Sequence, residues 1–333
     1  MTWTTVSAED VVSEWDHQLE CFPDQNLYQS AAWGQYKRMR GWTPKYFRAE
    51  SDGAVVGMVQ ALVRVRPFRT VVAWCPGGPV GTRQACSRDA MHQLSDLLAA
   101  RAMYCRASFL SAATPGDDEY LRANGWTRPA LAVGAPMTVV WDLRQSEEQL
   151  LAGLNRNWRY SLRQALKGEL AVEPMKPPPV EELAALSRVM NAAKGLRADL
   201  QVHELTALFE ALGHRAVVFG CRNAAGELMA FHSCGMQGRR AWELVAATSE
   251  EGRRRGASFA VLWALVLHCR RRGVTQYDLA GVDPDRAPGV TSFKRWTGAV
   301  DVEWLGEWEW STSSLLRHAV HLAVRRRSDA TLP

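Results

Sequence analysis

The sequence predicts an α/β protein built from two similar halves, each a mixed, mostly antiparallel sheet flanked by helices. Three observations carry this prediction: an internal repeat, a β-hairpin signal in each half, and a long helical pattern followed by a strand in each half. The length of 333 residues is enough for two domains of the usual size of about 100–200 residues. The hydrophobic fraction of 47% is enough to build two cores.

The repeat is defined by landmarks that recur at one constant spacing. Gly53 and Gly226 each lie in a hairpin turn, and 226 − 53 = 173. An aromatic residue and a glycine further along repeat the difference, 293 − 120 = 173 and 298 − 125 = 173, in the pairs Tyr120 and Phe293, and Gly125 and Gly298. A constant spacing of this length indicates a duplicated structural unit.

Each copy is predicted to run hairpin, strand, helix, strand, short helix and strand. In the first copy, an Asp-Gly turn at 52–53 precedes an alternating β-branched run, a helical pattern covers 91–103 and a strand covers 105–112. The corresponding hairpin, helix and strand of the second copy cover 223–245, 259–273 and 275–282.

The two copies are joined near residues 145–150, where a strand pattern changes into a helical one. One or two helices with a basic face follow and end at Gly168. The predicted domains are residues 1–147 together with 310–333, whose helix packs back on the first domain, and residues 148–309. That last helix is amphipathic with a basic end, so a peripheral contact with an anionic membrane is the alternative to packing.

Composition excludes several classes of protein. No apolar run approaches the roughly 18 residues of a membrane-spanning helix, and residues 1–20 lack the basic start and apolar stretch of a secretory signal. We therefore expect a cytoplasmic protein. The seven cysteines form no C-x-x-C pair, and cysteine and histidine lack metal-ligand spacing, which favours reduced thiols over disulfides or a metal site.

Arginines are concentrated in short clusters although the net charge is only +5. Such clusters attract phosphate, and the alternative is that they are solvated helix faces. The cluster at 253–255 precedes Gly256 and Ser258 at the start of a predicted helix, where backbone N–H groups and the helix dipole favour an anion. Alternation within EWLGEWEW favours strand packing over a stacking surface for most of the 14 tryptophans.

Motifs spread over most of the chain resemble one known family. The matching blocks are YQSAAWGQYKRMRGW, VVAWCPGGPVG, LNRNWRYSLRQALKG, YDLAGVDPDRAPGVTSFKRWTGA and the trailing VEWLGEWEW. Together they resemble the Fem peptidyltransferases, tandem-GNAT enzymes that move an amino acid from aminoacyl-tRNA onto a peptidoglycan precursor. The resemblance implies two GNAT-like domains in a compact form without a coiled-coil arm. It also implies a monomer that needs no cofactor or metal and whose acceptor is of the UDP-MurNAc-pentapeptide or lipid II type.

The resemblance further implies roles for individual residues. Lys294 is expected against the tRNA acceptor end, with Phe293 beside it. Independently of the resemblance, Asp278 ends a predicted strand before a loop, where functional groups collect, and is expected to hold the attacking amine or take its proton. The residues expected to bind the acceptor are Lys37, which would face a diphosphate, and Trp33, Tyr36, Gly78 and Arg197. The residues expected to meet tRNA phosphates are Arg156, Arg159, Arg163, Arg253, Arg254, Arg255 and Arg295. The alternatives are a solvated surface lysine at 294, a helix-face charge at 37 and a turn cap at 278.

The chain departs from the family pattern at several positions. Gly77 stands where the family usually has arginine, and either Arg197 or Lys194 fills the basic position of the acceptor site. The stretch before the helix also resembles the pyrophosphate loop of acyl-CoA-dependent GNAT enzymes, although it ends at Ser258 instead of Gly or Ala. The alternatives are therefore an acyl-CoA-dependent N-acyltransferase, a tRNA-dependent enzyme acting on a natural-product peptide or polysaccharide precursor, and a non-catalytic binding module.

The chemistry of an aminoacyl ester makes few demands on the protein because the ester is already activated. Alignment of the two reactants supplies about 7–11 kcal/mol, and one donor to the oxyanion about 2.7–4 kcal/mol. No G-x-S-x-G nucleophile elbow is present, so we expect direct aminolysis without a covalent enzyme intermediate. His232 lies on a predicted strand and is expected to be a hydrogen-bonded core residue and not a base.

Overall fold

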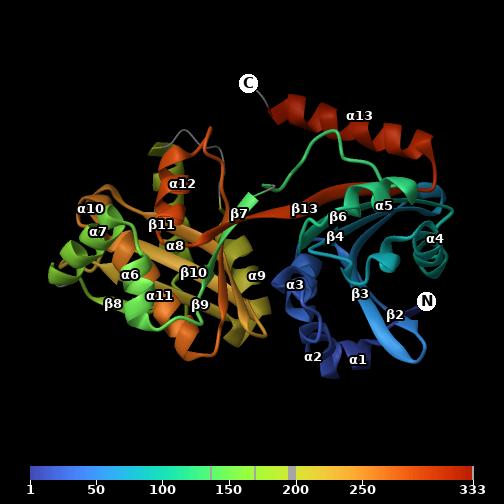
Figure 1. Cartoon of the computed structure of the whole chain (residues 1–333). Helices are drawn as coiled ribbons and strands as arrows, with labels where there is room; N and C mark the ends of the chain where they lie inside the picture. The colour runs from blue at the N-terminus through green and yellow to red at the C-terminus, as the bar shows by residue number, and fades with distance from the viewer. Residues whose placement is uncertain (136, 169, 194–199, 332–333) are drawn as a thin grey trace. The chain divides into compact units, whose positions relative to one another are not determined.

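The computed structural model describes residues 1–135, 137–168, 170–193 and 200–331 (Figure 1). The chain forms two compact units, Met1–Pro136 with Glu303–Pro333, and Met137–Val302. Both are α/β, with mixed and mostly antiparallel sheets, which confirms the predicted fold class. In the part of the chain that the structure describes, no helix is both long and apolar enough to cross a membrane.

The first unit is built on a sheet with the strand order β1-β2-β3-β4-β6-β13, in which only the β4–β6 pair is parallel. The strands are β1 (Thr2–Thr5), β2 (Thr43–Ser51), β3 (Ala54–Arg66), β4 (Thr70–Pro76), β6 (Ala102–Ala112) and β13 (Val300–Ser311), and the short β5 (Val80–Gly81) pairs with β3. The helices are α1 (Ala8–Ser13), α2 (Trp15–Glu20), α3 (Ala31–Met39), α4 (Arg88–Leu97), α5 (Asp117–Ala123) and α13 (Ser314–Thr331).

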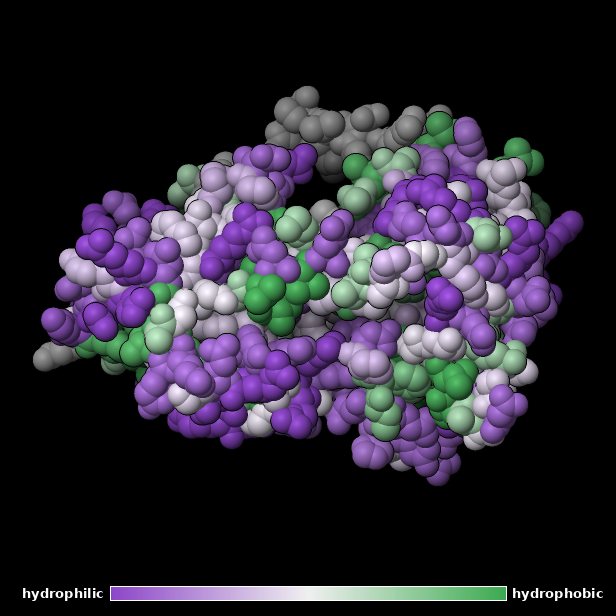
Figure 2. Space-filling view, viewed as in Figure 1, coloured by the Kyte–Doolittle hydropathy of each residue, from purple (hydrophilic) through white to green (hydrophobic). Residues whose placement is uncertain are grey.

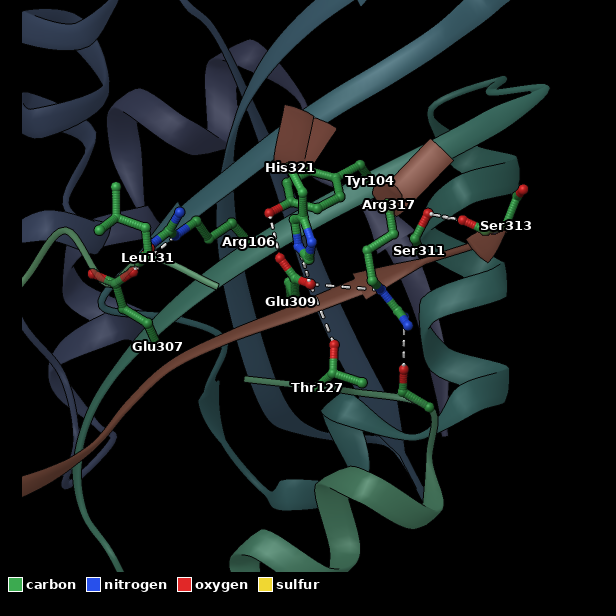
Figure 3. A network of polar contacts seen from close by, with 11 residues as sticks. Tyr104, Arg106, Thr127, Leu131, Glu307, Glu309, Ser311, Ser313, Arg317 and His321 are labelled. Carbon is green, nitrogen blue, oxygen red and sulfur yellow. Dashed lines mark hydrogen bonds and ion pairs between the residues drawn. The ribbon is translucent and has the colours of Figure 1, made fainter. Parts of the chain in front are cut away.

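A buried carboxylate in the first unit fixes α13 to the strand before it (Figure 3). Glu309 on β13 has a side chain that is 1% exposed. It accepts a hydrogen bond of 2.8 Å from the Tyr104 hydroxyl on β6, and its Oε1 lies 2.6 Å from His321 Nε2 on α13. Arg317, one helical turn before His321, is 3.7 Å from the same oxygen and donates to the Gly125 carbonyl. Four polar partners, with Thr127 as the fourth, thus compensate the cost of burying this charge.

The second unit is built on a sheet with the order β7-β12-β11-β10-β9-β8, in which only the β11–β12 pair is parallel. Its strands are β7 (Met137–Asp142), β8 (Val172–Pro174), β9 (Ala216–Arg222), β10 (Leu228–Gln237), β11 (Arg240–Thr248) and β12 (Gln276–Gly281). The helices are α6 (Glu147–Gly153), α7 (Arg156–Lys167), α8 (Val180–Ala193), α9 (Val202–Leu212), α10 (Glu250–Arg254), α11 (Ala257–Arg271) and α12 (Pro288–Arg295).

Helices cover both faces of this second sheet. Val217 and Phe219 on β9 belong to the core with α6, α7 and α11, whereas Val218 belongs to a separate core with α8 and α9. Alternate residues of one strand point to opposite faces, so each helix layer has its own core. The fully buried Trp158 of α7 lies in the first of these cores, against Trp141 and Phe259.

In each unit, the strand at one end of the strand order given above comes from the other half of the sequence. β7 follows the first copy along the chain but pairs with β12 of the second unit, and β13 follows the second copy but pairs with β6 of the first. The sequence places residues 137–147 in the first domain and 303–309 in the second, whereas by packing residues 137–147 belong to the second unit and 303–309 to the first. Periodicity identifies a strand but does not say which sheet it joins.

Several predicted elements differ from the observed ones in their limits. The predicted helix at 91–103 is too long: α4 ends at Leu97, Ala99 has a left-handed φ of 50°, and β6 already begins at Ala102. The region after the join forms two helices, α6 and α7, and Gly168 caps the second as predicted. The arginines at 253–255, expected just before a helix, themselves lie in the short helix α10 and its C-terminal cap.

The glycine landmarks of the repeat have matching backbone conformations. Gly53 and Gly226 have φ values of 78° and 82°, and Gly125 and Gly298 have 86° and 81°. All four lie in the left-handed region, which costs a residue with a Cβ about 1–2 kcal/mol. The repeat found in the sequence is thus also present in the backbone.

Gly298→Ala is expected to destabilise the protein more than Gly226→Ala. A Cβ at 298 would lie 2.6 Å from the Gly153 carbonyl oxygen, whereas a Cβ at 226 meets nothing within 4 Å. Both variants carry the left-handed penalty, and overpacking adds about 1–3 kcal/mol at 298 alone. Urea unfolding of the two variants measures the difference in the free energy of unfolding, and equal losses would contradict the steric account.

Candidate active site

The end of β12 places a buried carboxylate in the second unit. Asp278 is 8% exposed, and its Oδ1 accepts hydrogen bonds from the Thr138 hydroxyl on β7 and, at 2.7 Å, from the Ala280 backbone N–H. Ala280 has a left-handed φ of 62°, which turns the chain so that this N–H faces back to Asp278. Burial raises the pKa of Asp278 above the usual aspartate value, and the two hydrogen bonds oppose that shift.

Lys294 on α12 places an ammonium at the same strand end. Its Nζ donates to the carbonyl oxygen of Gly281 at 2.7 Å and to that of Ala280 at 3.2 Å. Burial lowers the pKa of Lys294, and the nearby carboxylates of Glu243 and Asp278 partly restore it. An ammonium has three donors, so two carbonyls leave one N–H for a substrate oxygen. Lys294 and Asp278, singled out from the sequence, thus lie at one place.

Phe293 is held rigidly between the second core and this site. Its ring stacks on the His232 imidazole, with centroids 6.2 Å apart and planes 18° apart, and contacts Phe259 edge-on. The indole N–H of Trp158 donates to the Phe293 backbone carbonyl at 3.1 Å. Contacts with the core therefore fix the orientation of Phe293, which precedes Lys294 in the last turn of α12.

A chain of polar groups that the sequence pattern does not bring together lies against Phe293. His232 Nδ1 is 2.7 Å from Glu243 Oε1, and His232 Nε2 is 2.7 Å from Ser258 Oγ. The Tyr277 hydroxyl donates to the other carboxylate oxygen of Glu243, and burial raises the pKa of Tyr277 well above its usual value. His232 is hydrogen-bonded in the core, as expected. A single acidic residue in the apolar strand AWELVAAT is the signal that could have singled out Glu243.

The first unit holds its own cluster of predicted residues. The ammonium of Lys37 on α3 lies 4.8 Å from the Trp33 ring centre, 4.7 Å from Tyr36 and 5.3 Å from Trp74 on β4. Cation–π contact with three rings holds the charge at one point. Ser30 caps α3 by accepting a hydrogen bond from the Trp33 backbone N–H. This bond fixes the start of the helix that carries Trp33, Tyr36 and Lys37. Lys37, Trp33 and Tyr36 are close in the sequence and were predicted together. Trp74 was not predicted, because it lies on a strand that is distant in the sequence.

Gly78 lies in a loop that two buried amides support. Gln29 Nε2 donates to the Pro76 carbonyl and Asn26 Nδ2 to the Gly77 carbonyl, both at 2.8 Å. A Cβ at 78 would lie 2.5 Å from Gln29 Cδ, so close packing alone explains a glycine there. Its role in acceptor binding stays a prediction. Arg197 and Lys194 lie outside the residues that the structure describes.

The predicted phosphate-binding arginines differ in their surroundings. On α7, Arg156 and Arg163 are exposed, and Arg159 donates to the Leu154 carbonyl. Figure 2 shows hydrophilic residues gathered over the surface of α7 and α10. Arg253 is exposed, whereas the remaining three form ion pairs that a phosphate would have to displace, namely Arg254 with Glu250, Arg255 with Glu251 and Arg295 with Asp301.

Comparison with known proteins identifies the fold. Residues 154–295 match a family described as an acetyltransferase (GNAT) domain. No curated protein sequence matches the chain. A crystal structure of FemX superposes with a TM-score of 0.83 at 18% identity, covering 96% of this chain and 100% of that one.

Two further solved structures are similar to this chain over almost its whole length. The C-terminal domain of a putative lysylphosphatidylglycerol synthetase from Agrobacterium fabrum has a TM-score of 0.57 at 16% identity, covering 96% of both chains. A tandem GNAT protein from the clavulanic acid biosynthesis pathway has a TM-score of 0.57 at 14% identity, covering 94% of this chain and 98% of that one. The chain thus has the tandem GNAT fold of FemX, which confirms the predicted resemblance at the level of the fold.

Proposed function

We propose that this protein is an aminoacyltransferase that moves an amino acid from aminoacyl-tRNA to an amine of a peptide acceptor. The observation that carries the proposal is Lys294, whose ammonium is held at the end of β12 by two backbone carbonyls next to a rigid Phe293. The similarity of fold to FemX and to a putative lysylphosphatidylglycerol synthetase supports an aminoacyl donor. Action as a cytoplasmic monomer is part of the proposal.

The proposed reaction is direct aminolysis of the aminoacyl ester. The amine attacks the ester carbonyl, and the third N–H of Lys294 binds the oxygen on which negative charge develops. Asp278 holds the attacking amine through Oδ2 of its carboxylate. The hydrogen bonds from Thr138 and Ala280 described above both end on the other oxygen, Oδ1. Phe293 packs against the acceptor end of the tRNA. No step requires a metal, a cofactor or an acylated side chain.

The proposed acceptor is a peptide-bearing cell-wall precursor of the UDP-MurNAc-pentapeptide or lipid II type. A diphosphate is recognised by a fixed cation, and three aromatic rings fix the ammonium of Lys37. Tyr36, which is half-buried, supplies flat apolar surface to the same ligand, and Trp33, which is 8% exposed, acts through its contact with Lys37. If the acceptor is lipid-linked, α13, which exposes Leu315 and Leu322, supplies a peripheral membrane contact.

A second candidate is an acyl-CoA-dependent N-acyltransferase, favoured by one local observation. Gly256, with φ of 69°, opens α11 as its N-terminal cap, and backbone N–H groups at such an end bind phosphate. The family match to an acetyltransferase (GNAT) domain covers this segment. For a tRNA-dependent enzyme, the alternative acceptor is a natural-product peptide or a polysaccharide precursor, and one similar structure is a tandem GNAT protein from the clavulanic acid biosynthesis pathway.

Transfer of a labelled amino acid from a pool of charged tRNAs into small acceptors of a bacterial extract tests the proposal. We expect label in a low-molecular-weight product, no product after RNase treatment, and none above background with Lys294→Ala. Transfer that survives RNase treatment, or no transfer at all with the wild-type protein, would refute the tRNA-dependent function.

Binding of tRNA is expected to weaken steeply with salt, and less steeply when α7 loses its arginines. Each phosphate contact contributes about 0.7–0.9 to the slope of log affinity against log salt concentration. The double variant Arg156→Ala and Arg163→Ala should therefore lower the slope by about 1.4–1.8. Exposed Arg66 and Arg101 of the first unit provide the matched control pair. An equal fall of the slope in both double variants would show that α7 has no special role in binding tRNA.

A further inference from the structure

Ser258, His232 and Glu243 form a continuous hydrogen-bonded chain with a defined direction. Both distances along it, Ser258 Oγ to His232 Nε2 and His232 Nδ1 to Glu243 Oε1, are 2.7 Å. An ionised carboxylate can only accept, so we assign the donor role to Nδ1 and the acceptor role to Nε2. Nε2 then has its lone pair toward Ser258 and accepts the serine proton. The chain is therefore set to draw a proton from the hydroxyl toward the carboxylate.

The interior of this chain is buried, and both of its ends are partly buried. The Glu243 and His232 side chains are 10% and 7% exposed, and the second oxygen of Glu243 is occupied by the Tyr277 hydroxyl. Ser258, in the first turn of α11, is only half-buried. Ser258 is thus the member of the chain at which a substrate amine is proposed to bind, and the Glu243 carboxylate lies at the other end, where it stabilises positive charge on the His232 ring.

The chain lies beside the groups proposed to bind the donor. The His232 ring stacks on Phe293, whose neighbour Lys294 lies in the field of Glu243. Ser233, next to His232 on β10, shows the hydrogen bonds of a serine with a structural role. It is fully buried, and its hydroxyl donates to the Val245 carbonyl and accepts from the Val245 N–H. Ser258, which is partly buried, instead ends a chain of ionisable groups.

We infer that Ser258, His232 and Glu243 act as a proton relay in aminoacyl transfer, an inference that rests on the proposed function. When the amine attacks, the C–N bond forms and the carbonyl electron pair moves to oxygen. The amine proton passes to Ser258 Oγ as the serine proton passes to His232 Nε2, and Glu243 stabilises the imidazolium. When the C–O bond breaks, the ribose oxygen takes a proton from Ser258, which regains its own from His232. The products are an amide and a free tRNA hydroxyl.

In these terms Ser258 is a catalytic residue, and His232 and Glu243 are positioning residues that act through it. The relay and the groups described above have separate roles in the reaction. Lys294 stabilises the oxyanion, Asp278 holds the amine, and the relay moves the proton. Serine forms no bond to the acyl group, which keeps the reaction a direct aminolysis.

Single-turnover transfer from one charged tRNA, with saturating protein and acceptor, tests the relay. We expect Ser258→Ala and His232→Gln to slow transfer by about 10²–10³-fold, since general acid–base catalysis contributes about 10²–10⁴-fold. Ser258→Thr keeps a hydroxyl and should restore the rate to within about tenfold of the wild type, on the same scale. The wild type should react more slowly in D₂O, and Ser258→Ala should lose that isotope effect. Ser233→Ala, which loses a structural hydroxyl, is the matched control and should transfer at the wild-type rate.

Each other outcome overturns the inference in a recognisable way. Wild-type rates in Ser258→Ala would remove the relay but leave the proposed function intact. Equal losses in Ser258→Ala and Ser258→Thr, with unchanged isotope effects, would make Ser258 a structural residue. Labelled amino acid bound covalently to Ser258 after an acid quench would make it a nucleophile. Absence of transfer in the wild type would refute the proposed function, and the relay with it.

Discussion

Lys294→Ala is expected to lower kcat/KM for aminoacyl transfer by about 10²–10³-fold, the usual effect of removing one donor to an oxyanion. The ammonium is fixed by the Gly281 and Ala280 carbonyls, so the transition state gains its charge without reorganisation of the side chain. Because the interaction strengthens only as charge develops, the loss should fall mainly on kcat. Steady-state kinetics with a single charged tRNA measures it.

A loss of activity could also arise from damage to the fold, so stability must be measured alongside. Burial of the Lys294 ammonium is unfavourable by itself, as its lowered pKa shows, and truncation should therefore cost little stability. We expect a midpoint of thermal unfolding close to that of the wild type. Full activity of Lys294→Ala would place the oxyanion donor elsewhere.

Activity should also decline at alkaline pH, and the decline should begin at a lower pH than a lysine with the usual pKa would cause. The charged form of Lys294 is the active one, and burial lowers its pKa below the usual value of about 10.4. Charge, and activity with it, is thus lost as the pH rises through the lowered pKa. Lys294→Arg keeps its charge above pH 12 and should remove this decline even if its rate is reduced. An identical alkaline decline in both proteins would assign it to another group.

Trp158→Ala is expected to lower the free energy of unfolding of the second unit by about 3–5 kcal/mol. The indole is fully buried, contacts Trp141, Phe259 and Phe293, and donates to the Phe293 carbonyl. Truncation leaves both a cavity and a carbonyl without its partner. Since Phe293 loses its support, transfer should also slow more than the stability loss alone explains.

Trp296→Ala provides the matched control for this prediction. Trp296 follows α12 in the same unit, but its side chain is 39% exposed, so truncation should cost less than about 1 kcal/mol. Urea unfolding followed by circular dichroism compares the two variants. Equal stability of both would show that the core around α7 does not support the site.

The duplicated architecture could be predicted because its signals are local. Gly53 and Gly226 need a left-handed conformation, and a turn of that kind between alternating strands leaves a readable pattern. The exchange of β7 and β13 could not be predicted, because strand periodicity carries no information on the partner. The sheet that a strand joins depends on tertiary packing.

The candidate site was predictable only where a motif keeps its residues close in sequence. Phe293 and Lys294 are neighbours, and Asp278 shares their segment, so a family resemblance brings them together. Glu243 and Ser258 meet at His232 only because β10, β11 and the start of α11 converge in space. Hydrogen bonds between such distant positions are set by strand register, which the sequence alone does not reveal.

Competition between two labelled donors tests the central claim most directly. The protein is given tritium-labelled aminoacyl-tRNA and ¹⁴C-labelled acetyl-CoA together, at equal concentrations, with one pool of peptide amine acceptors. The proposed function predicts tritium in the peptide product and no ¹⁴C above the level found without protein. Incorporation of ¹⁴C without tritium would contradict it and make the protein an acyl-CoA-dependent acyltransferase.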